Sequence, residues 1–260
     1  MTGQGHQHRA ARLCGVTNYL EAVEAEVAAV SRLLAGADAE TQVPTCPGWT
    51  IRDLIVHLGG THRWVTHIVA TGATERVPYR QVVTEPSPSD DLVEWLGSGA
   101  RELLAALGQA DPDAPVWAWG EDRHQRFWPR RMLHETMIHR ADLEIALGLS
   151  PEFDPAHAVD GIDEFFANLP HARSIAPRLE RLTSSGEVVH LHATDVEGEW
   201  LVTLPPAGYA WSRGHGKGDA ALRGPVSDLL LVVYGRRSPD TLTVFGDREL
   251  LERWITTTAL

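Results

Sequence analysis

The chain has few cysteines and no long apolar run, and each absence excludes a class of protein. Cys14 and Cys46 are the only cysteines among 260 residues, which excludes a disulfide framework and a cysteine-rich zinc site. No stretch approaches the length of a membrane-spanning helix. The N-terminal residues contain no apolar segment like that of a signal peptide. We therefore expect a protein of the reducing cytoplasm.

Positive charge is also scarce. The 23 lysines and arginines are outnumbered by 35 aspartates and glutamates, which leaves a formal net charge of −12. This charge disfavours nucleic acid and anionic membranes as partners. The hydrophobic content of 43% and the charged content of 22% are typical of a soluble globular protein, and the length allows one large domain or two of ordinary size.

Apolar residues recur at helical spacing four times in the first half of the chain. After a polar leader over residues 1–15, which we expect to be disordered, this spacing predicts helices over about residues 16–36, 50–69, 90–107 and 128–148. Gly59 and Gly60 interrupt the second helix and allow either a close helix contact or a kink. Four amphipathic helices within residues 16–150 indicate a four-helix bundle.

The pattern changes after residue 150. Residues 188–194 and 199–204 alternate as two strands around a turn, which predicts a β-hairpin. We expect shorter strands over 209–212, 220–223 and 241–245, and helices over 156–168, 226–234 and 248–258. Residues 151–260 therefore form a small α+β domain, and the fold class of the whole chain is an α-helical bundle followed by an α+β domain.

Chemistry-bearing residues gather in the last predicted helix of the bundle. Glu135 and His139 are four residues apart, about 40° around a helix axis, so one ion can touch both. His134 and His139 are about 140° apart, too far round the helix for one ion. The pair shares its half of the helix with apolar residues, and a buried carboxylate is costly unless it is paired or bound to metal. A buried Glu–His hydrogen bond is the alternative reading.

A third ligand is available on the second helix. His57 lies at the edge of its apolar stripe, where it is either an ordinary edge residue or a ligand. Two imidazoles and one carboxylate suit a catalytic zinc site whose fourth position is left to water or substrate, and they also suit non-haem iron. Asp142, three residues after His139, could orient a ligating imidazole or a substrate, or form a surface ion pair.

Several motifs together resemble one family. The segments Val43–His57 and Arg131–Asp142 resemble two signatures of the mycothiol-dependent maleylpyruvate isomerase family, which belongs to the DinB-like four-helix metalloproteins. Segments 190–195, 198–202, 222–231 and 245–247 resemble the small α+β domain of this family, which is similar to sterol-carrier-protein folds. The resemblance covers roughly residues 16–256 and is specific for the family rather than for a reaction.

The resemblance implies a divalent metal, usually zinc, held by His57, Glu135 and His139. It implies that the metal activates the thiol of a co-substrate, mycothiol, as a thiolate. In the isomerase the thiolate adds to an activated double bond, the bond rotates and the thiol leaves, whereas related members are S-transferases. An arginine of the C-terminal domain is implied to bind substrate carboxylates. Arg236 is our first candidate and Arg223 the second.

We therefore expect a metal-dependent, thiol-using isomerase or transferase that acts on a small electrophile, as a monomer or homodimer. The nucleophilic thiol is expected from the co-substrate rather than from Cys46. One alternative is a non-catalytic module with a structural metal and a C-terminal domain that binds a ligand or protein. Another is metal-assisted hydrolysis with Asp142 as the base. The electrophile, the thiol and the native metal stay open.

Overall fold

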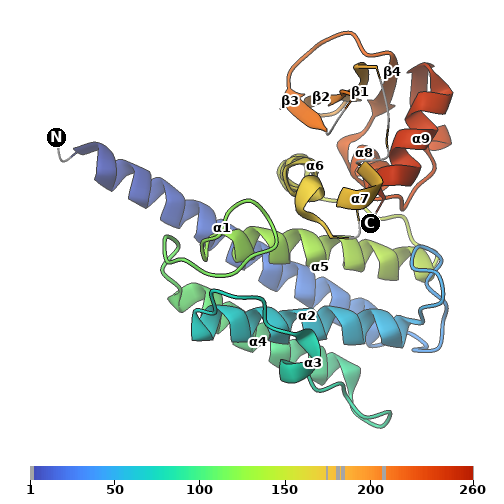
Figure 1. The fold of residues 1–260 in the computed structure, drawn as a ribbon. Helices are drawn as coiled ribbons and strands as arrows, with labels where there is room; N and C mark the ends of the chain where they lie inside the picture. Colours follow the sequence, from blue (N-terminus) through green and yellow to red (C-terminus); the bar gives the residue numbers. More distant parts are fainter. Residues whose placement is uncertain (1–2, 174, 180–181, 183–184, 207–208, 260) are drawn as a thin grey trace. The chain divides into compact units, whose positions relative to one another are not determined.

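The computed structural model describes residues 3–173, 175–179, 182, 185–206 and 209–259, with only the backbone described for residues 3–18 (Figure 1). The chain divides into two compact units, Met1–Pro151 and Glu152–Leu260. This division falls beside the boundary predicted after residue 150. Among the described residues, none of the helices is both long enough and apolar enough to span a membrane.

The first unit is helical. Helix α2 (Ile51–Thr71) packs against α4 (Leu92–Gln109) and α5 (Phe127–Ala146), and α1 (Gly3–Leu34) packs against α4 and α5, with the short α3 (Tyr79–Val82) beside α2. The contacts bury leucines, isoleucines and tryptophans that recur at helical spacing, among them Leu54, Leu58, Leu96, Leu103 and Trp128. The helical N-terminal region that the sequence predicted is confirmed.

Helix α1 differs from its prediction at the N-terminus. Its backbone is helical from Gly3, whereas the sequence predicted a disordered leader over residues 1–15; residues 1–2 lie outside the described part of the chain. The leader has no apolar stripe, and this led to the prediction of disorder. It also has no proline, and its residues 10–13, Ala-Ala-Arg-Leu, all favour helix.

Helix α2 has strong signals at both ends. The Thr50 hydroxyl accepts a hydrogen bond from the backbone N–H of Asp53, and the Asp53 carboxylate accepts one from the backbone N–H of Thr50, which forms a capping box. At the other end Gly72 adopts the left-handed conformation, with φ of 59°, that closes many helices. These caps fix the register of the helix and so the direction of its side chains.

The two central glycines of α2 provide close contacts. The helix continues unbroken through them, so of the two alternatives that the sequence left open the close contact occurs and the kink does not. A Cβ atom on Gly59 would lie 2.3 Å from the Trp95 ring of α4, and one on Gly60 would lie 1.7 Å from the Tyr79 hydroxyl oxygen of α3. Glycine is therefore required at these positions to let α4 and α3 approach the α2 backbone.

The second unit consists of a five-stranded sheet and helices. The strand order is β3-β2-β1-β4-β5; the β1–β4 pair is parallel and the other pairs are antiparallel. The strands are β1 (Glu187–Ala193), β2 (Glu199–Leu204), β3 (Ala210–Arg213), β4 (Ala220–Gly224) and β5 (Thr243–Gly246). All of them overlap the strands predicted from the sequence, and the predicted α+β class is confirmed.

Helices cover the apolar side chains of this sheet. Val189, Leu191, Trp200, Val202 and Leu222 are fully buried, and they alternate with more exposed residues along β1, β2 and β4. The helices are α6 (Pro155–Asn168), α7 (Ala176–Leu179), α8 (Val226–Val233) and α9 (Arg248–Thr258), together with the short 3₁₀ turns Leu169–His171 and Pro239–Thr241. His190 and His192 lie on the opposite face of β1 from Val189 and Leu191.

The contact at Gly59 yields a test of the bundle. Gly59→Ala should lower the free energy of unfolding by about 1–3 kcal/mol, because its methyl group overlaps the Trp95 ring. Gly97→Ala in α4 is the matched control. Its methyl group meets only the Arg101 guanidinium, at 3.4 Å, so it should be neutral or stabilise by up to ~1 kcal/mol. Urea denaturation of the full chain measures both, and equal effects would contradict the contact.

Candidate metal centre

Three polar side chains converge where α2 packs against α5. His57 projects from α2, and Glu135 and His139 project from successive turns of α5. The Nε2 atom of His57 lies 3.1 Å from Oε1 of Glu135, and Nε2 of His139 lies 3.3 Å from the same oxygen. One ligand atom from each residue lies within 4.8 Å of the others. The structure thus brings together the three residues that the sequence nominated as metal ligands.

Two further charged residues hold this group in place. Nδ1 of His139 lies 2.9 Å from Oδ2 of Asp142, so the ring presents Nε2 to Glu135. Asp142 is fully buried. Arg131, one turn before Glu135, donates to Oε2 of Glu135 at 2.5 Å, which leaves Oε1 to face the two histidines. The Asp142 contact is the one expected of a residue that orients a ligating imidazole.

The electrostatic state of the group follows from these contacts. Burial of Glu135 opposes its ionisation, but Arg131 and the hydrogen bonds from His139 and His57 outweigh burial and hold the pKa of Glu135 well below its usual range. Burial of His139 opposes its protonation, but the hydrogen bonds to Asp142 and Glu135 outweigh burial and raise the pKa of His139 to about 9. Glu135 is therefore ionised, and without a bound cation His139 is protonated at neutral pH.

The donor set fits a divalent cation with an open coordination position. Imidazole nitrogens and a carboxylate oxygen are ligands that zinc and similar ions prefer. Among the described residues, no fourth ligand atom from a histidine, cysteine or carboxylate joins His57, Glu135 and His139. The His57 side chain is 38% exposed, whereas the His139 side chain is 10% exposed, so the group is open on the His57 side.

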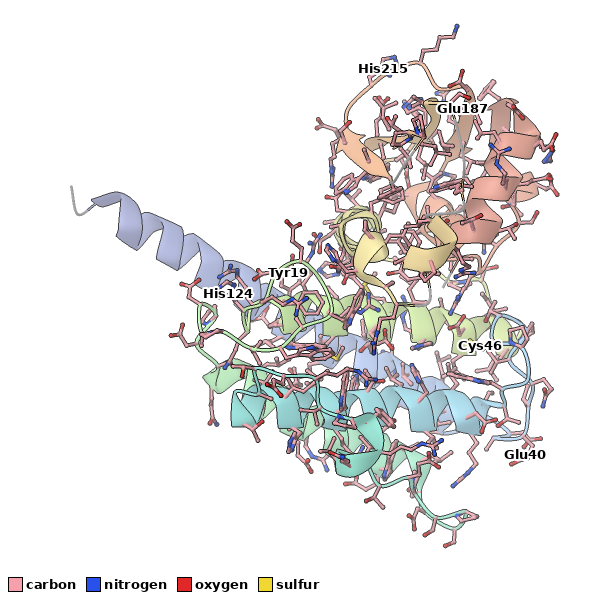
Figure 2. The ribbon with its side chains drawn as sticks, viewed as in Figure 1. Tyr19, Glu40, Cys46, His124, Glu187 and His215 are labelled. Atoms are coloured by element: carbon pink, nitrogen blue, oxygen red, sulfur yellow. The ribbon has the colours of Figure 1, made fainter. Side chains whose placement is uncertain are left out.

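The loop before α2 adds two residues that the metal prediction missed. Backbone hydrogen bonds from Val43 to Trp49 and from Cys46 to Val43 fold residues 43–49 back on themselves. The Trp49 ring then lies 5.0 Å from the His57 ring and 6.5 Å from the His139 ring. The thiol of Cys46, a residue labelled in Figure 2, donates to Oδ2 of Asp142 at 3.5 Å. The signature motif contained both residues, but periodicity alone could not place a loop.

Arg131 was also missed, although a sequence signal for it existed. It precedes Glu135 by four residues, the spacing at which opposite charges meet on one helix.

Two other histidines do not join the group. His134 is buried but has no place in any of the ligand groups found among the described residues. His62 is buried next to Thr136, at 3.2 Å, and burial lowers its pKa to about 4.

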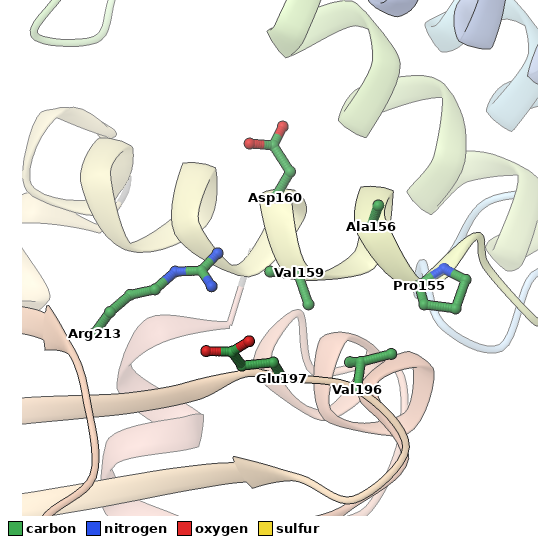
Figure 3. Close-up of a pocket in the computed structure, with 7 residues that line it drawn as sticks. All are labelled: Pro155, Ala156, Val159, Asp160, Val196, Glu197 and Arg213. Atoms are coloured by element: carbon green, nitrogen blue, oxygen red, sulfur yellow. The ribbon is translucent and has the colours of Figure 1, made fainter.

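The two arginines nominated from the sequence belong to the second unit. Arg223, on β4, is exposed and lines a cavity of about 490 Å³, and no carboxylate pairs with it in the part of the chain that the structure describes. Arg236 follows α8 and donates to the backbone carbonyl of Tyr234 at 2.9 Å. A separate cavity of about 480 Å³ beside α6 has Glu197 and Arg213 as charged lining residues from the sheet side (Figure 3). The substrate-binding role of Arg223 and Arg236 stays a prediction.

Comparison with known proteins gives matches in both units. Residues 20–144 match the family described as the mycothiol maleylpyruvate isomerase N-terminal domain, and residues 156–253 match the MDMPI C-terminal domain. An uncharacterized protein of Mycobacterium tuberculosis, in strains CDC 1551 / Oshkosh and ATCC 25618 / H37Rv, is 27% identical, and the match covers 85% of this chain and 85% of that protein.

Two solved structures share the fold. The crystal structure of the mycothiol-dependent maleylpyruvate isomerase aligns with a TM-score of 0.55 at 19% identity. A histidine-to-alanine mutant of that isomerase aligns with a TM-score of 0.58 at 16% identity. Each alignment covers 88% of this chain and 92% of the other. At this identity the similarity is one of fold.

The raised pKa of His139 would make the binding of a divalent cation at these residues depend on pH. A ligating imidazole must be neutral, so zinc binding at pH 7 should displace about one proton from His139, and affinity should rise about tenfold per pH unit up to the pKa near 9. Calorimetry at pH 7 in two buffers of different ionisation enthalpy measures this proton. His139→Gln is the control that should lack it, and equal proton release from both proteins would contradict the assignment.

Proposed function

Because the chain belongs to the mycothiol-dependent maleylpyruvate isomerase family, we propose that it is a metal-dependent enzyme that uses a low-molecular-weight thiol. Mycothiol is the proposed thiol, and the substrate is a small electrophile. The reaction is either isomerisation of a double bond, through reversible addition of the thiol, or transfer of the thiol to the electrophile. We propose His57, Glu135 and His139 as the ligands of a divalent cation, with zinc as the first choice.

The observation that carries this proposal is the convergence of one ligand atom from each of these three residues on a site open on one side. A bound divalent cation would favour the thiolate over the thiol, and the thiolate is the nucleophile. A closed set of four protein ligands would instead indicate a structural metal. The three-ligand set therefore supports an enzyme over a non-catalytic module.

The neighbouring residues have roles that follow from their contacts. Asp142 accepts the Nδ1 proton of His139 and so keeps Nε2 directed toward Glu135. Arg131 fixes the other oxygen of Glu135 and balances its buried charge. The Trp49 ring packs beside both imidazoles. We propose Asp142 and Arg131 as positioning residues.

The thiol is proposed to come from the co-substrate rather than from the protein. The Cys46 thiol donates its proton toward Asp142, and that carboxylate is already engaged with His139. A neighbouring carboxylate favours the neutral thiol over the thiolate, and a thiol is a weaker nucleophile than a thiolate. Metal-assisted hydrolysis with Asp142 as the base is also disfavoured, because Asp142 is fully buried and its carboxylate is already engaged with His139 and Cys46.

We propose that an arginine of the second unit binds a carboxylate of the substrate. A planar guanidinium suits this task because it can form two parallel hydrogen bonds to a carboxylate. Arg223 has the more available side chain, since it is exposed and lines a cavity. Arg236 follows the apolar helix α8 and is the other candidate. A reducing cytoplasm is the proposed compartment, because the thiol co-substrate stays reduced there.

The function is tested with the zinc-loaded full chain, supplied with mycothiol and either maleylpyruvate or a generic electrophile. We expect thiol-dependent turnover, and we expect His57→Ala and Glu135→Gln to lower kcat/KM by about 100-fold or more, as when a group that stabilises developing charge is removed. His67→Ala, an exposed histidine on the same helix as His57, is the matched control and should keep full activity.

Rates of substrate loss and of free-thiol consumption distinguish the outcomes. Substrate loss without net consumption of thiol indicates an isomerase, and stoichiometric consumption indicates a transferase. If no electrophile turns over although zinc binds and His57→Ala lowers the amount of zinc bound, the enzyme assignment fails and the non-catalytic module replaces it. Turnover that is independent of thiol would contradict the proposed chemistry.

A further inference from the structure

A second group of potential metal ligands lies in the second unit, on the outer face of the sheet. His190 and His192 lie on β1, Glu199 begins β2, and His215 lies in the loop after β3. One ligand atom from each of the four lies within 4.8 Å of the others. The family comparison and the proposed reaction leave this group without a role.

The sheet itself brings three of the four residues together. His192 and Glu199 are direct partners in the antiparallel register of β1 and β2, and His190 lies two residues along the same face. Nε2 of His190 lies 2.9 Å from Oε2 of Glu199, and Nδ1 of His192 lies 3.2 Å from Oε1. The opposite face of β1 carries the buried Val189 and Leu191. Because side chains alternate along a strand, His190 and His192 must both project from the other face.

The loop over residues 214–219 carries the fourth residue and is tied down at both ends. Gly214 donates its backbone N–H to the Glu199 carbonyl, and Asp219 exchanges two hydrogen bonds with the backbone of Val188. These anchors hold Nδ1 of His215 at 2.7 Å from Oε2 of Glu199.

Glycines let this loop lie close to the sheet. A Cβ atom on Gly216 would lie 2.8 Å from the Leu201 side chain, and one on Gly218 would lie 2.9 Å from Cβ of His190 and 2.5 Å from the Ala220 carbonyl oxygen. The loop is therefore built to approach β1 and β2, which keeps His215 over the other three residues.

The donor set and its spacing fit a four-coordinate cation. Around an ion with bonds of about 2.0–2.1 Å, tetrahedral ligand atoms lie ~3.3 Å apart, near the 2.7–3.2 Å measured here between the imidazole nitrogens and Glu199. Three imidazole nitrogens and one carboxylate oxygen are donors of the kinds that zinc binds.

We propose that His190, His192, Glu199 and His215 form a binding site for a divalent cation of the zinc type. Four protein ligands make a closed coordination shell, which is typical of structural rather than catalytic zinc. The cation would bind the loop over 214–219 to the β1–β2 hairpin, and the first unit's candidate metal centre would remain separate from it.

The test measures zinc bound to the untagged full chain by equilibrium dialysis and elemental analysis. We expect two zinc ions per chain, one of which is lost in His215→Ala and in Glu199→Gln. The dissociation constant of that ion should rise more than about tenfold in each variant, because even the removal of a residue that only supports a ligand can cause such a loss. His124→Ala is the matched control. It removes a histidine that pairs with a single carboxylate, Asp122, at 2.7 Å, and should leave both ions bound.

Hydrogen exchange locates the ion independently of its stoichiometry. Zinc should slow exchange of the backbone amides of residues 214–219 in the original chain and not in His215→Ala, whose side chain is 79% exposed and can be removed without disturbing the core. His57→Ala should keep this protection, which separates the proposal from the proposed function. Unchanged stoichiometry and affinity in His215→Ala, or no zinc-dependent protection of the loop, would overturn the site and leave a hydrogen-bonded cluster.

Discussion

The partly buried carboxylate of Glu135 is the group on which the arrangement of the candidate metal centre depends. An ionised carboxylate between packed helices is stable only where donors surround it. Arg131 from its own helix, His139 one turn further and His57 from α2 provide these donors. Asp142 then balances the protonated His139, and the loop that carries Cys46 and Trp49 closes over them. The same contacts that stabilise the charge also aim three ligand atoms at one point.

Much of this was predictable from the sequence where geometry is local. The spacing of Glu135 and His139 fixes their common helix face, and the alternation of His190 and His192 fixes their common strand face. The two classes of fold and all five strands followed from periodicity and turn signals. The helical backbone over residues 3–15 did not, because a polar stretch gives no apolar pattern even where its residues favour helix.

Features that depend on loops or on tertiary packing could not be predicted. Trp49 lies against His57 only because residues 43–49 fold back, and His215 reaches Glu199 only because its loop is anchored to β1 and β2. Whether Gly59 and Gly60 produced a kink or a close contact depended on Trp95 and Tyr79, which are distant in sequence. The two groups of potential metal ligands also differ, since the first brings three candidate residues together and the second brings four.

The proposed binding of a divalent cation by His57, Glu135 and His139 can be tested directly by anomalous X-ray diffraction at the zinc edge. The crystals would be of the full chain, grown with zinc. We predict a strong anomalous peak about 2.0–2.2 Å from Nε2 of His57, Oε1 of Glu135 and Nε2 of His139, with a non-protein ligand at the remaining position. A zinc-loaded crystal with no peak there, in which His57 and His139 remain directly hydrogen-bonded to Glu135, would contradict it.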